Sequence, residues 1–212
     1  MIAGAAGSLR RNAPKSGTRP TSDRVREAIF SALESWGMVD GTRVLDLYAG
    51  SGALGLEAAS RGASEVTLVE KHGPAAQIAS SNAKIVLGAF RGATAPTAEV
   101  IRASVQSTLD TMSSPGDTGR FDVILLDPPY DVGEAELAAN LAAAAPLLAL
   151  DGVLLVERSS RSPEPAWPSA VDGAAAPAGL TLLREKRYGE TVLWWAERAD
   201  RESDTEVEHL TD

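Results

Sequence analysis

The sequence predicts an α/β fold in which a mostly parallel, seven-stranded sheet carries helices on both faces and ends in an antiparallel hairpin. Three observations support this prediction. Short apolar runs alternate with Ala- and Leu-rich helical segments after Gly41, and the run Phe121–Asp127 is as apolar as a buried parallel strand. The last two runs are separated only by Tyr188-Gly189-Glu190, which suits a tight hairpin turn.

A first helix is expected ahead of the strand–helix units. It starts at Thr21 or Ser22, because either side chain can cap a first turn that contains Asp23, and it ends near Gly37. Its apolar residues recur at the spacing of one helical face: Val25, Ile29, Leu33 and Trp36.

Strands and helices then alternate along the chain. The expected strands are Arg43–Ala49, Glu65–Glu70, one within Thr97–Arg102, Phe121–Asp127 and Gly152–Glu157. The expected helices are Ala53–Arg61, Pro74–Val86, one within Val105–Met112, and Glu134–Leu150. The Pro- and Ala-rich stretch Ser162–Gly179 is expected to be a loop, and the hairpin pairs Leu180–Arg187 with Thr191–Glu197. Trp194 and Trp195 must point to opposite faces of the last strand, so one of them is expected at the surface.

The composition is that of a globular domain. Of the 212 residues, 44% are hydrophobic and 23% are charged, and no apolar run reaches the roughly 20 residues that a membrane span needs. The absence of cysteine excludes disulfides, thiolate metal sites and cysteine nucleophiles. The first residues lack the apolar stretch of a secretory signal. We therefore expect a cytoplasmic protein, a monomer, without a metal site or a membrane partner.

The charge is unevenly distributed along an acidic chain. The formal net charge is -9, yet Met1–Arg26 holds six basic residues against one acid, and Glu197–Asp212 holds seven acids against two arginines. We expect three parts: residues 1–20 as an arm or hairpin that binds nucleic-acid phosphates, residues 21–198 as the main domain, and residues 199–212 as an acidic disordered tail. A merely solvated N-terminus is the alternative.

A glycine-rich turn after the first strand predicts a nucleotide-cofactor site. Gly50, Gly52 and Gly55 form a GxGxxG pattern, which lets a ligand approach the backbone closely but is shared by NAD, FAD and S-adenosylmethionine sites. Two acids favour S-adenosylmethionine. Asp46 is placed to meet a cationic amino-acid group, and Glu70, at the end of the next strand, is placed to bind ribose hydroxyls. Alternatively, Asp46 caps the following helix and Glu70 is a surface charge.

Three further residues complete the expected cofactor site. Tyr48 and Ser51 belong to the same turn as the glycines. After the third strand, Ser104 is the candidate to bond the adenine ring, with Ala103 beside it. An aspartate is usual at this position in enzymes that use this donor.

The tetrapeptide Asp127-Pro128-Pro129-Tyr130 directly follows the fourth strand and is the most specific signal in the chain. The exocyclic amine of a nucleic-acid base is a poor nucleophile because its lone pair is delocalised into the aromatic ring of the base. Hydrogen bonds from the amine to the Asp127 carboxylate and the Pro128 carbonyl would aim its nitrogen at the sulfonium methyl, and the carboxylate would stabilise the positive charge that develops. The prolines stiffen the loop, and Tyr130 offers a face on which a flipped-out base can stack. An ordinary strand-end turn is the alternative.

With these residues, the chain resembles the bacterial 16S ribosomal RNA guanine-N2 methyltransferases of the small ribosomal subunit, from about Ile2 to Ala196. The stretch most specific to that family is Thr18–Phe30, and the glycine loop, the tetrapeptide and Tyr188–Thr191 also match. The resemblance implies a Rossmann-like class I methyltransferase fold. It also implies methyl transfer from S-adenosylmethionine to one guanine N2 of 16S rRNA in an assembled or assembling small subunit.

The resemblance also implies roles for the N-terminal segment. The expected phosphate contacts are Arg10, Arg11, Arg19 and Arg24. Thr21 and the helix after it would help to cover the donor pocket. The chain departs from the family at Ala3–Leu9, which is less basic than usual, and at Ser104.

Several alternatives stay open from the residues alone. The tetrapeptide would equally suit adenine N6 in DNA or RNA, or a glutamine side-chain amide. A non-catalytic RNA-binding factor would need neither the tetrapeptide nor the glycine loop. A nicotinamide-dependent oxidoreductase is supported by the GxGxxG pattern only.

Overall fold

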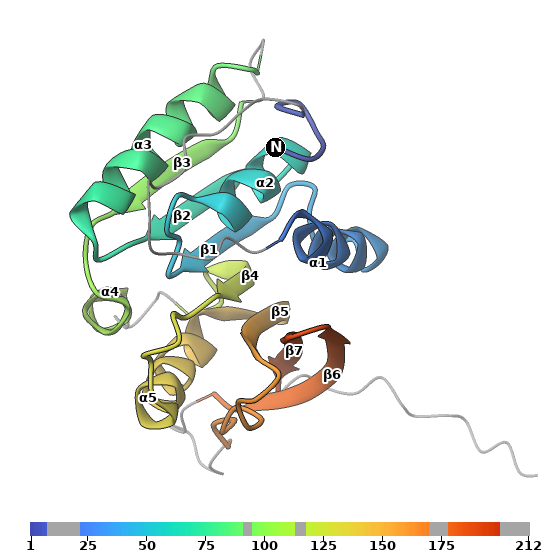
Figure 1. The fold of residues 1–212 in the computed structure, drawn as a ribbon, viewed down its shortest axis with the longest axis vertical. Helices are drawn as coiled ribbons and strands as arrows, with labels where there is room; N and C mark the ends of the chain where they lie inside the picture. Colours follow the sequence, from blue (N-terminus) through green and yellow to red (C-terminus); the bar gives the residue numbers. More distant parts are fainter. Residues whose placement is uncertain (8–21, 91–94, 113–117, 170–177, 200–212) are drawn as a thin grey trace, which may run out of the picture.

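The computed structural model describes residues 1–7, 22–90, 95–112, 118–169 and 178–199. Its strands are β1 (Arg43–Leu47), β2 (Glu65–Val69), β3 (Thr97–Ile101), β4 (Phe121–Leu126), β5 (Leu148–Ser159), β6 (Leu180–Tyr188) and β7 (Thr191–Arg198). They form one sheet in the order β3-β2-β1-β4-β5-β7-β6 (Figure 1). Neighbouring strands from β3 to β5 are parallel, and β7 is antiparallel to both β5 and β6. The predicted fold class is confirmed.

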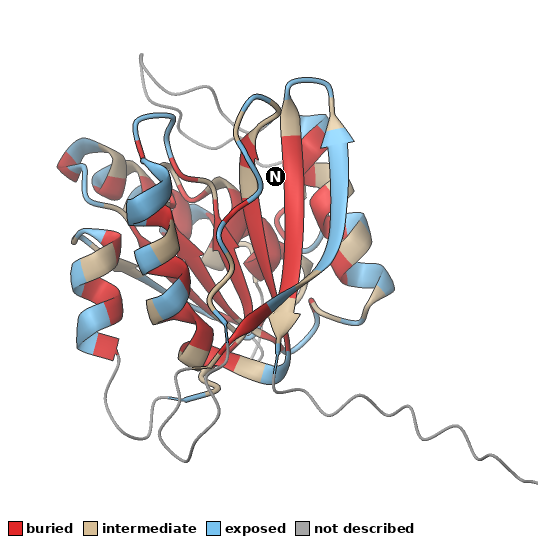
Figure 2. Ribbon diagram, turned by 90° about the horizontal axis from the view of Figure 1, so that it is seen from below, coloured by how far each residue is buried: buried red, intermediate tan, exposed pale blue. Residues whose placement is uncertain are grey.

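Helices cover both faces of this sheet. On one face lie α1 (Asp23–Ser35), α2 (Ala53–Arg61) and α3 (Gly73–Leu87), and on the other lie α4 (Val105–Met112) and α5 (Glu134–Ala144). Alternate residues of β4 explain the two layers, since Val123 and Leu125 pack with the first group and Ile124 and Leu126 with the second. The central strands are therefore buried along their length (Figure 2).

Two sequence predictions about the second half of the chain are wrong. The helix expected at Glu134–Leu150 ends at Ala144, where a 3-10 turn, Ala145–Leu147, leads into β5. Pro146 lies in that turn, and a proline cannot continue a helix because it lacks an N–H and its ring clashes with the preceding turn. The strand β5 therefore begins at Leu148, four residues earlier than expected.

The second error concerns the paired tryptophans of β7. They do point to opposite faces, but both are buried, because the sheet is covered on both sides here too. Trp195 meets Trp36 of the α1 C-cap edge to face, with 5.0 Å between ring centroids. Trp194 joins the core on the side of α5.

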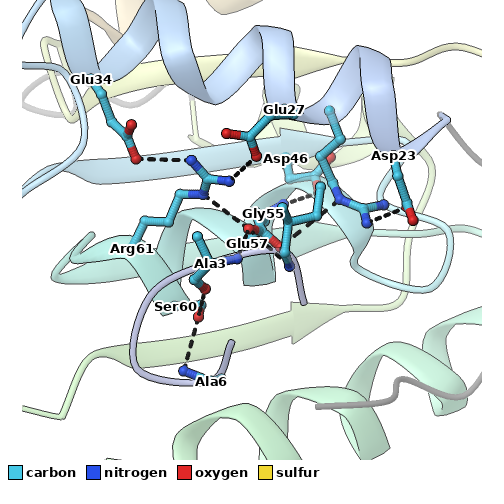
Figure 3. Close-up of polar contacts among 12 residues, drawn as sticks. Ala3, Ala6, Asp23, Glu27, Glu34, Asp46, Gly55, Glu57, Ser60 and Arg61 are labelled. Carbon is cyan, nitrogen blue, oxygen red and sulfur yellow. Dashed lines mark hydrogen bonds and ion pairs between the residues drawn. The ribbon is translucent and has the colours of Figure 1, made fainter. Parts of the chain in front are cut away.

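The N-terminal residues that the structure describes pack on the domain, while the RNA-binding arm or hairpin expected over residues 1–20 stays a prediction. The N–H groups of Ile2 and Ala3 donate to the buried Glu57 carboxylate of α2, at 2.9 and 3.0 Å. The N–H of Ala6 donates to Ser60 Oγ, also on α2, at 3.0 Å (Figure 3). Residues 1–7 therefore extend the layer around α2, and the rest of the expected arm lies outside the described residues.

A charged cluster fastens α1 to α2. The Arg61 guanidinium of α2 is 3% exposed and donates to Glu57 on its own helix and to Glu27 and Glu34 on α1 (Figure 3). It also lies 5.0 Å from the ring centroid of Phe30. A buried arginine is tolerated when carboxylates satisfy its donors, so this cluster fixes the position of α1 against α2. As predicted, Ser22 caps α1 by accepting from the N–H of Val25.

Candidate active site

The glycine turn and the tetrapeptide leave the sheet side by side. β1 and β4 are neighbours, with Leu47 opposite Leu126, so Tyr48 and Asp127 follow at the same level. The helices after the two strands, α2 and α5, lie on opposite faces of the sheet. This arrangement is a topological switch point, where open α/β sheets bind ligands beyond the carboxyl ends of their strands.

The turn after β1 relies on left-handed backbone conformations. Tyr48, Gly50 and Gly52 have φ values of 66°, 57° and 78°. A non-glycine residue at such an angle stores strain that commonly marks a functional site. A Cβ built on Gly50 would meet no other described heavy atom within 4 Å, so the turn is open on that side. This open side is where a ligand can approach the backbone.

Gly55 serves packing rather than open space. A Cβ there would lie 2.4 Å from Leu68 Cδ2 and 2.9 Å from Val66 Cγ1, so only glycine lets α2 approach β2 this closely. Its N–H donates to Asp46 Oδ2 at 2.8 Å. Gly55 therefore has a structural role behind the turn, and its part in cofactor binding stays a prediction.

Asp46 is a buried carboxyl group beneath the turn. It is 1% exposed, and burial raises its pKa to about 7, while the Gly55 N–H lowers it and the charges of Asp127 and Glu70 raise it further. Its bond to the first turn of α2 matches the alternative interpretation of Asp46 as a helix cap. Its contact with the cofactor's amino group stays a prediction.

Glu70 links two loops at the same edge. One carboxylate oxygen accepts from the N–H of Gly50 at 2.9 Å and the other from the N–H of His72 at 2.6 Å. Glu70 is therefore more than a strand-end surface charge, since it holds the glycine turn next to the loop after β2. Each oxygen keeps a further lone pair for a ligand hydroxyl, so ribose binding stays a prediction.

The tetrapeptide presents an aromatic ring to solvent. Pro128 is buried, Asp127 is half-buried, and Pro129 and Tyr130 are exposed. Tyr130 is 79% exposed, the most exposed large apolar side chain in the described part of the molecule. The loop turns back at once, with the N–H of Val132 donating to the Pro129 carbonyl at 3.0 Å. A ring held out by so tight a turn offers a face for stacking.

Two residues that sequence reasoning missed brace this region. Asn140 of α5 is fully buried and donates to the Tyr48 hydroxyl at 2.6 Å, which ties the glycine turn to the helix after the tetrapeptide. Burial is the main cause that raises the pKa of Tyr48, to about 12. Arg158 of β5 donates to the Val132 carbonyl at 3.3 Å and forms an ion pair with Glu134. Asn140 therefore braces the glycine turn, and Arg158 braces the end of the loop that follows the tetrapeptide.

The remaining sequence candidates fall into two groups. Ser104 caps α4, since its Oγ accepts from the N–H of Ser107 at 3.2 Å, and the Ser51 carbonyl accepts from Asn82 at 2.9 Å. A direct bond from either residue to the cofactor stays a prediction. Arg24 is exposed in the first turn of α1. The other expected RNA contacts lie outside the described residues: Arg10, Arg11, Arg19 and Thr21.

A protein-family model described as "Conserved hypothetical protein 95" matches residues 1–197. The chain belongs to this family. The Haemophilus influenzae protein named ribosomal RNA small subunit methyltransferase D is 34% identical over 173 residues, which are 82% of this chain and 79% of the relative. The Escherichia coli protein of the same name is 32% identical over 191 residues, 90% of this chain and 85% of the relative.

Solved structures agree with this assignment. A hypothetical protein from Thermus thermophilus superimposes with a TM-score of 0.73 at 30% identity, over 92% of this chain and 97% of the other. Magnesium protoporphyrin IX methyltransferase from Synechocystis, solved with bound S-adenosylmethionine, has a TM-score of 0.56 at 17% identity, over 86% and 87%. This second match shows the fold alone. The chain has the class I methyltransferase fold, and its curated relatives carry the name methyltransferase, in agreement with the predicted cofactor.

The described part of the chain contains neither a membrane-spanning helix nor a metal-binding group of side chains. None of the helices there has the length and hydrophobicity to cross a bilayer. The same residues contain no group of three or more acidic or histidine side chains arranged to hold a metal ion.

Proposed function

We propose that this protein transfers the methyl group of S-adenosylmethionine to the exocyclic N2 of a guanine in the 16S rRNA of the small ribosomal subunit. The observation that carries the proposal is the position of Asp127–Tyr130, at the end of β4 and directly beside the glycine turn after β1. The relatives named ribosomal RNA small subunit methyltransferase D support the choice of RNA. Residues Thr18–Phe30 favour this family over adenine or glutamine methyltransferases by resemblance.

The cofactor fits the residues that are present. The open side of Gly50 and the left-handed turn around it permit the close backbone approach that a nucleoside cofactor needs. Glu70 is placed to accept from the ribose hydroxyls, and Ser104 is the candidate at the adenine. When bound, S-adenosylmethionine supplies an electrophilic methyl group on a sulfonium sulfur.

The tetrapeptide acts on the acceptor amine. The Asp127 carboxylate accepts one N–H and the Pro128 carbonyl accepts the other, which fixes the direction of the nitrogen lone pair. Positive charge develops on that nitrogen as the methyl group transfers, so a fixed carboxylate stabilises the transition state more than the ground state. Tyr130 stacks on the extruded base and offsets part of the cost of unstacking it.

The direct test is transfer of labelled methyl groups to small subunits from cells that lack this enzyme, with naked 16S rRNA and DNA as parallel acceptors. Label at one guanine N2 of 16S rRNA is the expected result. Label at adenine, in DNA or in a protein amide would show that the acceptor is that group and not a guanine N2. If no acceptor is labelled while the donor is bound, the proposed activity is wrong.

The role of Asp127 has its own test with a matched control. D127A should lower kcat about 100-fold or more, because a preorganised charge at the reacting nitrogen is lost, while RNA binding changes little. Asp131 is an exposed carboxylate on the same loop, so D131N should retain turnover. Equal kcat in D127A and wild type would refute the role.

A further inference from the structure

A cationic groove lies between α1 and the edge strand β6, apart from the candidate active site. It encloses about 310 Å³, and its lining residues come from α1, β6 and β7. The α1 side presents small residues, Ala28, Ser31, Ala32 and Ser35. The facing side presents Arg184, Lys186 and Tyr188 from β6. No acidic residue is among its lining residues.

The charges in this groove are available to a ligand. Arg184 and Lys186 are exposed, and no carboxylate of the described residues forms an ion pair with either. Lys186 Nζ lies 5.3 Å from the ring centroid of Tyr188, a contact that orients the ammonium without neutralising it. By contrast, Arg187 points to the other face of the strand and pairs with Glu185 at 3.0 Å.

The acids of α1 are turned away from the groove. Glu27 and Glu34 bind Arg61 on α2, and Asp23 binds Arg26. The helix therefore presents its carboxylates to one neighbour and small hydroxyl and methyl groups to the other. On a chain with a net charge of -9, this leaves a local positive concavity in an otherwise acidic molecule.

The groove opens at the edge of the sheet where the tetrapeptide lies. Val156 of β5 is opposite Leu126, the last residue of β4, and β5 continues for three residues to Ser159. Ser159 pairs with Thr191, which in turn pairs with Tyr188. The β6–β7 turn therefore extends about 10 Å past the end of β4, at roughly 3.3 Å per residue. Tyr188 and Lys186 lie near that end of the groove.

We infer that this groove binds the phosphodiester backbone of the RNA substrate next to the target nucleotide. The guanidinium of Arg184, the ammonium of Lys186 and the hydroxyl of Ser31 can each donate a hydrogen bond to a phosphate oxygen. Contacts of this kind bind the nucleic-acid backbone without reading its base sequence. The inference rests on the proposed function, because it takes RNA to be the acceptor. It assigns Arg184 and Lys186 to substrate affinity, with no part in the methyl transfer itself.

The test compares the full-length double variant R184A/K186A with R187A, which removes a paired arginine from the opposite face of the same strand. Equilibrium binding of a 16S rRNA fragment and steady-state methylation are measured across a range of KCl concentrations. The double variant should bind RNA at least tenfold more weakly and raise KM equally, with kcat within twofold of wild type. The slope of log affinity against log salt is negative, and its magnitude should decrease by roughly 1.4 to 1.8, as for two lost phosphate contacts. R187A should stay within twofold.

Two outcomes would overturn the inference. In the first, affinity and salt slope are unchanged in the double variant. In the second, KM rises on assembled subunits while binding of naked RNA is unchanged, which would place a ribosomal protein in the groove. Unfolding curves and S-adenosylhomocysteine binding verify that the variant is folded. If the wild type methylates no ribosomal RNA, the proposed function is wrong. The RNA-binding measurements alone then still test whether the groove binds RNA.

Discussion

The buried carboxyl group of Asp46 makes the stability of this protein depend on pH in a way that D46N should abolish. The pKa of Asp46 is raised from 3.8 to about 7, and burial is the largest cause. Between these values the folded protein holds a proton that the unfolded chain releases. The free energy of unfolding therefore falls as pH rises from about 4 to about 7. The shift corresponds to a penalty of about 4 kcal/mol, fully present above pH 7 and absent below pH 4.

The substitution D46N removes that penalty and introduces a different one. Its amide oxygen can still accept from Gly55, but its NH2 group brings buried donors that cost about 1–3 kcal/mol when unpaired. We therefore expect D46N to be less stable than wild type near pH 4 and more stable near pH 8. The two stabilities should cross in between.

Urea denaturation at pH 4, 6 and 8 measures this difference directly. The difference between the two proteins is the quantity to compare, because the contributions of other titrating groups then cancel. T67V, a change without a titrating group at a buried position of the neighbouring strand, should differ from wild type by the same amount at every pH. A difference between D46N and wild type that does not vary with pH would refute the reasoning.

Three further substitutions test the packing around the site. For each, the expected loss is a decrease in the free energy of unfolding, measured by urea denaturation. G55A should lose about 1–3 kcal/mol, because the new Cβ would lie 2.4 Å from Leu68 Cδ2, and an unchanged midpoint would contradict this packing. E57Q should lose about 3 kcal/mol, because it neutralises a fully buried carboxylate that accepts hydrogen bonds from an arginine and two main-chain N–H groups. A loss well under about 1 kcal/mol would show that this charge is dispensable. Y48F should lose about 1–3 kcal/mol, because the amide of Asn140 loses its acceptor, and stability equal to wild type would show that the bond contributes nothing.

The sequence predicts the sheet, and the meeting of the glycine turn with the tetrapeptide, because both depend on local signals. Glycine spacing, a continuous apolar strand and the tetrapeptide after it lie within short windows, and parallel strands then bring their carboxyl ends together. The boundary between α5 and β5 was harder. Leu148 and Leu150 suit a helix and a strand equally, and Pro146 was the one local sign that the helix ends before them.

Contacts between distant segments explain what the sequence does not reveal. Tyr48 and Asn140 are 92 residues apart in the chain, and no local pattern joins them. Asn140 did carry a weak signal, since it follows Leu137 by three residues on the apolar face of an Ala- and Leu-rich helix. The segment Met1–Gly7 was expected to belong to an N-terminal arm or hairpin, and it is rich in glycine and alanine. Small residues also permit close packing, and Gly4 lies so near Ser60 that a Cβ would meet its carbonyl oxygen at 1.8 Å.

The distribution of charge in the site indicates how affinity and catalysis are divided. Asp46, Glu70 and Asp127 converge where β1, β2 and β4 end, and the charges of Glu70 and Asp127 lie close enough to act on the pKa of Asp46. Such a group of carboxylates attracts a cationic cofactor and repels a polyanion. If RNA is the substrate, as we propose, its binding energy must come from contacts away from these carboxylates, and the groove with Arg184 and Lys186 offers cations for such contacts. On this reasoning, substitutions in the groove change KM and its salt dependence, whereas substitution of Asp127 changes kcat.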